Sequence, residues 1–457
     1  MVTAQPTTVS WPECSVTWPR PGPLFGMKGD TLWASGRIFS LMLAFLTVAC
    51  AKSSITDAGP TVGNGPIIAI SNGGAHTCAL RTSGKVLCWG YNGSRQLGDG
   101  VETHSTCTPP PSTGSTASVD CALSPVTVSG LVDAVEISAG GSSTCARRAS
   151  GAVVCWGGND HGQLGDGTTV GRPTPVAVLG LDDAIEISVG NYHACAVRSS
   201  GSVMCWGDNQ YGQIGDGITS HSTCGGRECS TAPVAVTAVS EATGVSVGDW
   251  VSCARQAAGT VMCWGINGAE GLLGDGRTHS GCGIMGTIDC SFTPVVVFNL
   301  ADAAEIAVGG NHACARRSSG EVACWGRNLA GELGDGSLAD HATPVAVDRL
   351  SDAVEVAAGS EHTCARRLDG SVVCWGRTEY GALGSGPAGL DCHAVRCYPS
   401  PWLVIGIVAA VELSANGRNT CARQTTGEML CWGANDLGQV GDGTTVTRFT
   451  PVRVLGL

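Results

Sequence analysis

Apolar and polar positions alternate with a period of two in short runs along most of the chain. The clearest stretch has four such runs, at residues 135–137, 145–147, 153–155 and 176–178, separated by glycine-rich turns. A period of two places successive side chains on opposite faces of a β-strand, so each run predicts a short strand. No helical periodicity of useful length follows residue 66. The pattern therefore predicts an all-β fold built from units of four strands.

The unit recurs seven times from Ile67 onward. We place the repeats at about 67–130, 131–180, 181–239, 240–299, 300–349, 350–406 and 407–457. A period of this size made of short strands predicts a propeller or a solenoid. A solenoid needs atypical capping repeats, whereas the first and last copies both carry the full pattern, ending in Cys88-Trp89 and Cys431-Trp432. A closed ring needs no caps, so we expect a seven-bladed β-propeller of four-stranded antiparallel blades over residues 67–457.

Every unit has two cysteines ten residues apart and a glycine six residues after the first cysteine. In the second unit, a three-residue hairpin loop ending at Gly151 sets Cys145 directly opposite Cys155, within disulfide reach. Redox-active or metal-binding pairs are the alternative, but regular placement on strands favours structural disulfides, each worth about 2.5–3 kcal/mol in the chain-entropy model. The expected hairpin pairs are Cys78–Cys88, Cys145–Cys155, Cys195–Cys205, Cys253–Cys263, Cys314–Cys324, Cys364–Cys374 and Cys421–Cys431.

Units one, three, four and six each carry an insertion before the fourth strand, and each insertion contains two more cysteines. The expected pairs are Cys107–Cys121, Cys224–Cys229, Cys282–Cys290 and Cys392–Cys397. Every cysteine after Cys50 then has a partner, as a disulfide framework requires. Three insertions also contain His-x-x-Cys, at His104, His221 and His279. A structural zinc site needs four ligands at short, fixed spacings, so we expect disulfide-pinned loops and no metal or other cofactor.

Composition narrows the classes of function and the compartment. Charged residues make up 14% of the chain and apolar residues 43%, which excludes a disordered chain. The net charge of −12 argues against a nucleic-acid binder, which needs a basic surface. Twenty-four cysteines indicate an oxidising compartment.

The residues before the repeats are typical of an exported protein. Residues 27–49 predict a signal peptide, with Lys28 and Arg37 before an apolar run that is too short to span a bilayer. The segment ending in Ala49-Cys50 resembles a bacterial lipobox, which predicts lipidation of Cys50 and an extracytoplasmic, membrane-anchored protein. Cleavage followed by free secretion is the alternative. We interpret residues 1–26 as a non-native extension and residues 50–66 as a flexible tether.

Other positions recur in the units without pointing to catalysis. A tryptophan follows the second cysteine in every unit, and we expect it to pack between neighbouring blades rather than to bind a ligand. His76, His193, His312 and His362 predict buried histidines bonded to the backbone. The aspartates of the Leu-Gly-Asp-Gly turns favour tight turns rather than calcium sites. The expected Glu–Arg pairs across adjacent strands are Glu136–Arg147, Glu305–Arg316, Glu355–Arg366 and Glu412–Arg423, whereas Glu186 lacks an arginine and Arg255 lies opposite Gly244.

The repeated motifs resemble those of the regulator of chromosome condensation repeat family. The resemblance rests on Gly-x-x-His-x-Cys-Ala, Ser-Gly-x-Val-x-Cys-Trp-Gly, Gly-Gln-Leu-Gly-Asp-Gly and Thr-Pro-Val, and it covers residues 67–457. It implies a seven-bladed propeller, and members range from exchange factors of small GTPases to a secreted bacterial inhibitor of β-lactamases. The systematic cysteines depart from the eukaryotic exchange factors.

No catalytic signature accompanies the repeats, so we expect a non-enzymatic, monomeric, extracytoplasmic scaffold that binds another protein. The insertions share one place in the repeat and should project from one face, so loops 101–124, 218–232, 277–293 and 387–401 are the expected contact surface. A guanine-nucleotide exchange factor, an inhibitor of an extracellular enzyme and a carbohydrate-binding or hydrolytic propeller are the alternatives.

Overall fold

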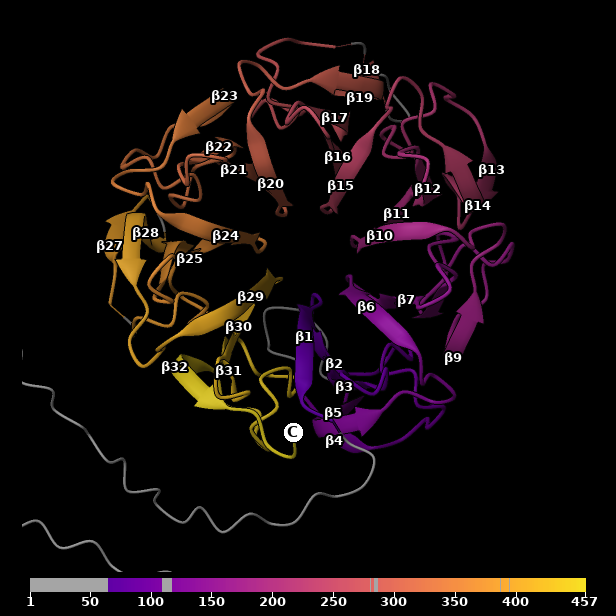
Figure 1. Ribbon diagram of the computed structural model, residues 1–457, viewed down its shortest axis with the longest axis vertical. Coiled ribbons are helices and arrows are strands. Elements are labelled where there is room, and N and C mark those ends of the chain that lie inside the picture. Colours follow the sequence, from indigo (N-terminus) through magenta and orange to yellow (C-terminus); the bar gives the residue numbers. More distant parts are fainter. Residues whose placement is uncertain (1–64, 109–116, 280, 283–286, 387, 394) are drawn as a thin grey trace, which may run out of the picture. The chain divides into compact units, whose positions relative to one another are not determined.

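A computed structural model describes residues 65–108, 117–279, 281–282, 287–386, 388–393 and 395–457. In these residues the chain forms strands and turns without an α-helix. Seven antiparallel sheets stand around a central channel, one sheet for each sequence repeat (Figure 1). The predicted fold class, a seven-bladed all-β propeller, is confirmed. The predicted extension, signal peptide and lipidation site, with all but the last residues of the tether, lie outside the described residues.

The first three strands have nearly the same length in all seven blades. The innermost strands are β1 (Ile67–Asn72), β6 (Ala134–Ala139), β10 (Ala184–Val189), β15 (Ala242–Val247), β20 (Ala303–Val308), β24 (Ala353–Ala358) and β29 (Ala410–Asn416). The second strands are β2 (His76–Arg81), β7 (Ser143–Arg148), β11 (His193–Arg198), β16 (Val251–Gln256), β21 (His312–Arg317), β25 (His362–Arg367) and β30 (Asn419–Gln424). The third strands are β3 (Val86–Tyr91), β8 (Val153–Gly157), β12 (Val203–Asp208), β17 (Val261–Ile266), β22 (Val322–Gly326), β26 (Val372–Arg377) and β31 (Met429–Gly433).

The outer part of the blades follows the insertions. The fourth strands are β5 (Val119–Thr127), β9 (Arg172–Ala177), β14 (Arg227–Ala235), β19 (Ile288–Val296), β23 (His341–Ala346), β28 (Val395–Leu403) and β32 (Arg448–Arg453). Blades one, three, four and six have a fifth, outermost strand, which sequence reasoning did not anticipate: β4 (Ser105–Cys107), β13 (Ser222–Cys224), β18 (Gly281–Cys282) and β27 (Leu390–Cys392). Each fifth strand comes from an insertion, because the insertion folds back on the lengthened fourth strand as a hairpin.

The central hairpin of each blade has the register that the cysteine spacing predicts. In the second blade Cys145 lies directly opposite Cys155, with 4.1 Å between their Cα atoms, and the sulfur atoms are bonded. The left-handed backbone of Gly151, with φ of 89°, closes the turn. All eleven cysteine pairs are joined as disulfides in the structure.

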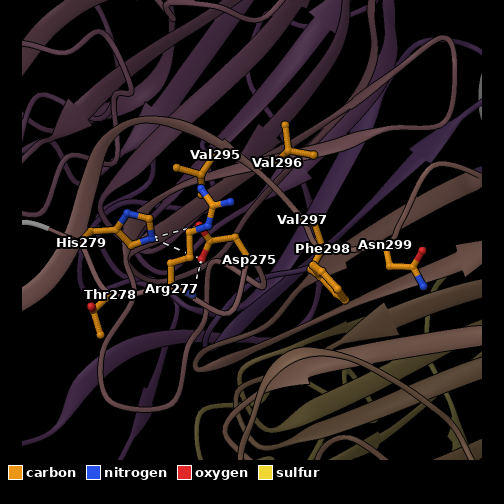
Figure 2. Close-up of a pocket in the computed structure, with 9 residues that line it drawn as sticks. All are labelled: Asp275, Arg277, Thr278, His279, Val295, Val296, Val297, Phe298 and Asn299. Carbon is orange, nitrogen blue, oxygen red and sulfur yellow. Dashed lines mark hydrogen bonds and ion pairs between the residues drawn. The ribbon is translucent and has the colours of Figure 1, made fainter.

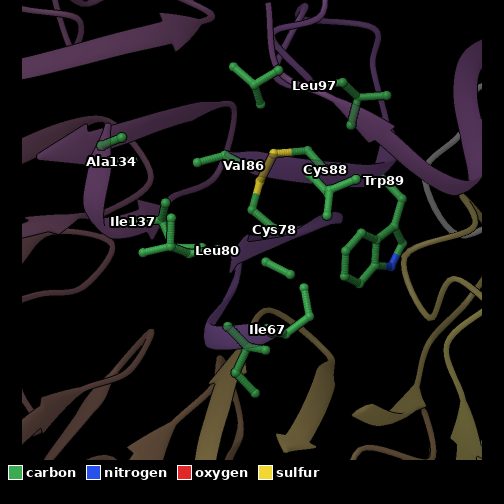
Figure 3. Packing of buried hydrophobic residues seen from close by; sticks show 14 of the residues in the cluster. Ile67, Cys78, Leu80, Val86, Cys88, Trp89, Leu97, Ala134 and Ile137 are labelled. Carbon is green, nitrogen blue, oxygen red and sulfur yellow. A yellow bond between two sulfur atoms is a disulfide. The ribbon is translucent and has the colours of Figure 1, made fainter. Parts of the chain in front are cut away.

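The hydrophobic core lies between blades rather than within them. Figure 3 shows the cluster at the first blade, in which the Cys78–Cys88 disulfide packs with Leu80 and Val86 beside Ile137 of the next blade. Each tryptophan after a second cysteine is fully buried, and its indole Nε1 donates to a carbonyl of the preceding blade, as Trp156 does to Gln96 at 2.9 Å. The prediction that these tryptophans pack between blades is confirmed.

Each blade is formed by one continuous stretch of the chain, so the ring closes without a sheet that combines strands from both ends. The backbone amide of Gly443 donates to Leu123 O of the first blade at 3.1 Å. Trp89 Nε1 donates to the carbonyl of Gln439 at 3.0 Å. The amide of Ile70 donates to Glu412 Oε1 at 2.9 Å, and that of Asn72 to Ser414 Oγ at 2.9 Å. The closing joint therefore repeats contacts found between other neighbouring blades.

Candidate protein-binding face

The connections between the first and second strands of the blades gather around one end of the channel. We call this end the loop face; its connections are residues 73–75, 140–142, 190–192, 248–250, 309–311, 359–361 and 417–418. Backbone hydrogen bonds link neighbouring connections, for example from Gly74 N to Gly140 O at 3.0 Å and from Ser360 N to Gly417 O at 2.8 Å. Such bonds also link blades two and three and blades five and six, whereas the connections of blades three and four are joined through the side chains of Asn191 and Asp249.

Side chains at equivalent positions of the loop face differ strongly between blades. The last residue of the connection is Ala75, Ser142 and Asn311 in blades one, two and five, but Tyr192 in blade three and Trp250 in blade four. The core tryptophans and the hairpin glycines, in contrast, recur in every blade. A position that the repeated fold leaves free can serve recognition, so the aromatic sector of blades three and four is the candidate site.

Five side chains from three blades form an aromatic–arginine cluster in this sector: His161, Tyr192, Tyr211, Arg227 and Trp250. The rings of Tyr192 and Trp250 are 4.8 Å apart and tilted by 31°, and Tyr211 meets Trp250 edge-on at 5.4 Å. The guanidinium of Arg227 lies over both rings, 5.9 Å from that of Tyr192 and 5.5 Å from that of Trp250. Tyrosine, tryptophan and arginine are the residues that most often dominate protein–protein interfaces.

The cluster joins one insertion to the body of the propeller. Arg227 begins β14 beside the turn of the third-blade insertion, where the Cys224–Cys229 disulfide closes the hairpin. Its Nη1 lies 3.4 Å from Oδ2 of Asp208, whose side chain is fully buried, and His161 Nδ1 lies 3.6 Å from the same oxygen. The buried carboxylate of Asp208 therefore contacts both the insertion of blade three and a loop of blade two, beside the aromatic rings.

A titratable carboxyl lies beside the cluster. Asp249 precedes Trp250, and its Oδ1 accepts a hydrogen bond from Asn191 Nδ2 at 2.7 Å. Burial raises the pKa of Asp249 to about 6, although the hydrogen bond from Asn191 opposes this shift. The charge beside the aromatic rings therefore changes near that pH.

Blades six and seven carry a second, charged cluster on the loop face. Arg377 bonds to Glu361 at 2.7 Å and to Glu379. The guanidinium groups of Arg377 and Arg418 lie 5.1 Å and 3.9 Å from the ring centre of Tyr380. The face is therefore unequal around the ring, with an aromatic sector in blades three and four and an ionic sector in blades six and seven.

Two hollows flank the inserted blades. One, of about 350 Å³, lies between the neighbouring insertions of blades three and four, with Gln210, Arg227 and Phe292 among its walls. The other, of about 710 Å³, is an open groove along blade four (Figure 2). There Val295, Val296 and Phe298 line one side, and His279 faces Asp275 on the other at 3.3 Å.

The histidines of the insertions contact carboxylates rather than the cysteines near them. His104 lies between Asp99, at 2.8 Å, and Asp120, at 3.1 Å. Burial lowers the pKa of His104, but the hydrogen bonds to the two carboxylates outweigh this and hold it above its ordinary value. His221 and His279 pair with the turn aspartates Asp216 and Asp275 in the same way. Within the described ranges, no group of three or more histidine, cysteine or acidic side chains is arranged to hold a metal ion.

The other recurring residues stabilise the joints between blades. The four expected Glu–Arg pairs are confirmed, with distances of 2.6 to 3.0 Å. The recurring histidines are buried as expected, but the predicted partner was wrong. Nε2 of His193 bonds to the hydroxyl of Ser252 in the next blade at 2.8 Å, not to the backbone. Burial lowers the pKa of His193 to about 3, so the ring stays neutral.

Fold and site together define a seven-bladed β-propeller with an unequal, insertion-bearing loop face. The chain belongs to the RCC1-like domain family, whose sequence model matches residues 46–388 and 124–457. Among solved structures, human WBSCR16 is similar with 19% identity and a TM-score of 0.66, over 81% of this chain and 93% of that one. Yeast RCC1 (Prp20) bound to Kap60 has 21% identity and a TM-score of 0.65, over 90% and 91% of the two chains.

A second solved structure is that of Prp20p from Saccharomyces cerevisiae, described together with its binding properties to Gsp1p and histones. It has 21% identity and a TM-score of 0.63, over 85% of this chain and 86% of that one. At these identities the similarity shows the fold alone.

The cysteine pairs also bear on the environment of the protein. So many paired cysteines indicate an oxidising, extracellular-type compartment. Over the residues that the structure describes, no helix has the length and apolar character needed to cross a bilayer.

Sequence reasoning missed the aromatic–arginine cluster, although it included Arg227 in loop 218–232. Tyr192 and Trp250 occupy a position where the other blades carry alanine, serine, asparagine, glutamate or arginine, whereas the position of Tyr211 also carries a tyrosine, Tyr380, in blade six. Comparison of the aligned repeats position by position would have shown these exceptions, but not that three blades bring them together.

Proposed function

We propose that the protein is an exported, lipid-anchored scaffold that binds another protein through the loop face and is not an enzyme. The aromatic–arginine cluster carries the proposal. It places two tyrosines, a tryptophan and an arginine in one half-buried patch beside a disulfide-pinned insertion. Such a patch resembles the anchor of a protein interface, in which a few aromatic and arginine side chains dominate the affinity.

The fold supports a binding role. Rigid strands and buried disulfides hold the loops, which lowers the entropy lost when a partner docks. Prp20, which shares this fold, has been solved in complex with the protein Kap60. Ion pairs and aromatic contacts on the loop face are the kinds of contact that protein interfaces use. The histidines of the insertions are bonded to neighbouring carboxylates.

A photo-crosslinking amino acid at position 211 of the protein in its native cells tests this role. We expect a discrete crosslinked protein from position 211 and none from position 446, which is 57% exposed in the seventh blade, away from the cluster. The Trp250→Ala variant should reduce the crosslinked product about tenfold, the effect of losing one interface anchor. Equal products from both positions, or none from position 211, would contradict the proposal.

The identity of the crosslinked protein separates the alternatives. A small GTPase would favour the exchange-factor hypothesis, and an extracellular enzyme whose activity falls on binding would favour an inhibitor. Glycan binding that persists in the Trp250→Ala variant would favour the carbohydrate-binding hypothesis over both the exchange factor and the inhibitor.

A further inference from the structure

We infer that the end of the propeller opposite the loop face docks on a lipid bilayer. This linker face consists of the turns between the second and third strands and the links that lead into each innermost strand. The turns and links touch, since Ala149 N donates to Asp133 O and Leu368 N to Asp352 O, both at 2.9 Å. This inference rests on the proposed function, because the proposed lipid anchor decides which end of the propeller lies near the membrane.

The described chain begins at the linker face. The carbonyl of Gly65 accepts a hydrogen bond from Arg81 Nη1 at 2.9 Å, and Ile67 begins the innermost strand of the first blade. If residues 51–64 serve as the tether that the sequence predicts, a coil of that length would reach roughly 19–22 Å. A lipid on Cys50 would therefore hold the linker face, rather than the loop face, near the bilayer.

Exposed apolar side chains occur at this end in neighbouring blades. Leu368, at a hairpin tip, is 77% exposed, and Val408, in the following link, is 70% exposed. Leu368 and Val408 lie in adjacent segments, because Gly370 of the tip packs against Ala409 of the link. Val132 is 61% exposed in the link to the second blade. At the start of the innermost strands, Ile68, Val135 and Ile185 are also exposed in blades one, two and three.

Several charges at the linker face are matched within the protein, although Asp182 and Glu241 in the links are exposed acidic residues. Four blades pair a link aspartate with an arginine at the end of the second strand: Asp133–Arg148, Asp183–Arg198, Asp302–Arg317 and Asp352–Arg367. Apart from Leu368-Asp369, the first three residues of each hairpin turn are serine, threonine, alanine or glycine. The fourth residue is charged in three blades, as Lys85, Glu321 and Glu428, and Glu428 pairs with Arg453 at 2.8 Å. In the seventh blade, Ala409 and Gln424 replace both members of the ion pair beside the exposed Val408.

This combination fits a lipid surface better than a second protein. An interfacial surface needs apolar side chains that reach the acyl boundary and few unpaired negative charges that anionic headgroups would repel. The small side chains at most hairpin tips permit close approach of the whole end, and the apolar residues around them form an arc through blades six, seven, one, two and three. The loop face then points away from the bilayer, where a protein partner can reach it.

Tryptophan quenching in membrane-bound protein tests the orientation. The full chain would carry Leu368→Trp or, as the matched control, Leu329→Trp, which follows Asn328 in a turn away from the linker face and is 44% exposed. With phosphatidylcholine vesicles that contain brominated acyl chains, we expect added quenching for Leu368→Trp and none for Leu329→Trp. Equal quenching of both, or quenching of Leu329→Trp alone, would overturn the inference.

A second pair of variants measures the attraction itself. Leu368→Asp combined with Val408→Asp should lower flotation of the full chain with the same vesicles about tenfold, and Leu329→Asp should leave it unchanged. Intact mass reports the anchor separately. A lipidated chain that floats without quenching at 368 would refute the docking face and leave the anchor standing. An unlipidated chain that floats and is quenched at 368 would refute only the anchor, and a chain that neither carries lipid nor floats would refute both.

Discussion

Glu332 shows how one residue departs from the repeat at an energetic cost. The equivalent position is glutamine in blades one, two, three and seven, where the amide oxygen accepts a backbone N–H two residues earlier. Glu332 Oε2 accepts the same bond from Ala330 N at 2.8 Å, but the side chain is buried and burial raises its pKa to about 7. The ionised form is therefore held in an unfavourable site.

Glu332→Gln should stabilise the protein at pH 8. The folded state binds a proton more tightly than the unfolded state here, so stability is highest at low pH and is lost as the pH rises through about 7. We expect the free energy of unfolding of the variant to exceed that of the parent by about 1–2 kcal/mol at pH 8 and to equal it at pH 5. Melting temperatures at the two pH values measure this, and equal gains at both would contradict the assigned cause.

The carboxyl groups between blades also contribute less to stability as the pH rises. Burial raises the pKa of both Glu186 and Glu305 to about 7, against the hydrogen bonds that each receives. Glu186→Gln should therefore raise the melting temperature more at pH 8 than at pH 5.5. Buried histidines such as His193, whose pKa burial lowers to about 3, have the opposite pH dependence, so comparison of the variant with the parent isolates the carboxyl. An equal change at both pH values would contradict this expectation.

Glycine at the Leu-Gly turn is required by the tryptophan of the next blade. A Cβ on Gly215 would lie 2.6 Å from the Trp264 ring, and Gly215 has a φ of +78°. Gly180 has a similar φ of +63° but open space around it. Gly215→Ala should therefore destabilise the protein by about 3 kcal/mol and Gly180→Ala by about 1 kcal/mol, as chemical denaturation can measure. Equal losses would show that backbone conformation alone is responsible.

Among the elements of the fold, the central hairpin was predictable and the cluster was not. The ten-residue spacing and the shared glycine set the register of Cys145 and Cys155 within one hairpin, so local geometry sufficed. Tyr192, Trp250 and His161 lie in different repeats, and only the angle between blades brings them together. The fifth strands were missed because the insertions contain few apolar positions that alternate.

The hairpin disulfides should carry more of the stability than those of the insertions. Replacing Cys145 and Cys155 together with alanine removes a buried link in the core between blades two and three. We expect a loss of about 3 kcal/mol in the free energy of unfolding, measured by denaturant titration. A loss below that of the equivalent change at Cys224 and Cys229 would contradict this ranking.

The Cys224–Cys229 bond should instead matter for recognition. It closes a turn of the third-blade insertion beside Arg227, which lies over Tyr192 and Trp250. Replacing both cysteines with alanine should leave the melting temperature within a few degrees of the parent and lower crosslinking from position 211. Unchanged crosslinking would separate the insertion from the binding site.

At the scale of the whole molecule, the two ends of the propeller differ in chemistry. The loop face carries an aromatic sector and an ionic sector, whereas the linker face combines matched ion pairs with exposed apolar side chains. Sequence reasoning predicted seven blades because each repeat is self-contained. It could not predict this difference between the ends, since position along the chain does not show which turns meet in space.

The proposed function requires an exported protein in which the cysteines of every blade are oxidised. The intact mass of protein from its native membrane fraction, measured before and after reduction, tests this most directly. We predict an N-terminus at a lipid-modified Cys50 and a gain on reduction of two hydrogens for each of the eleven cysteine pairs. An unprocessed chain whose mass does not change on reduction would contradict export and would favour an exchange factor in the cytosol.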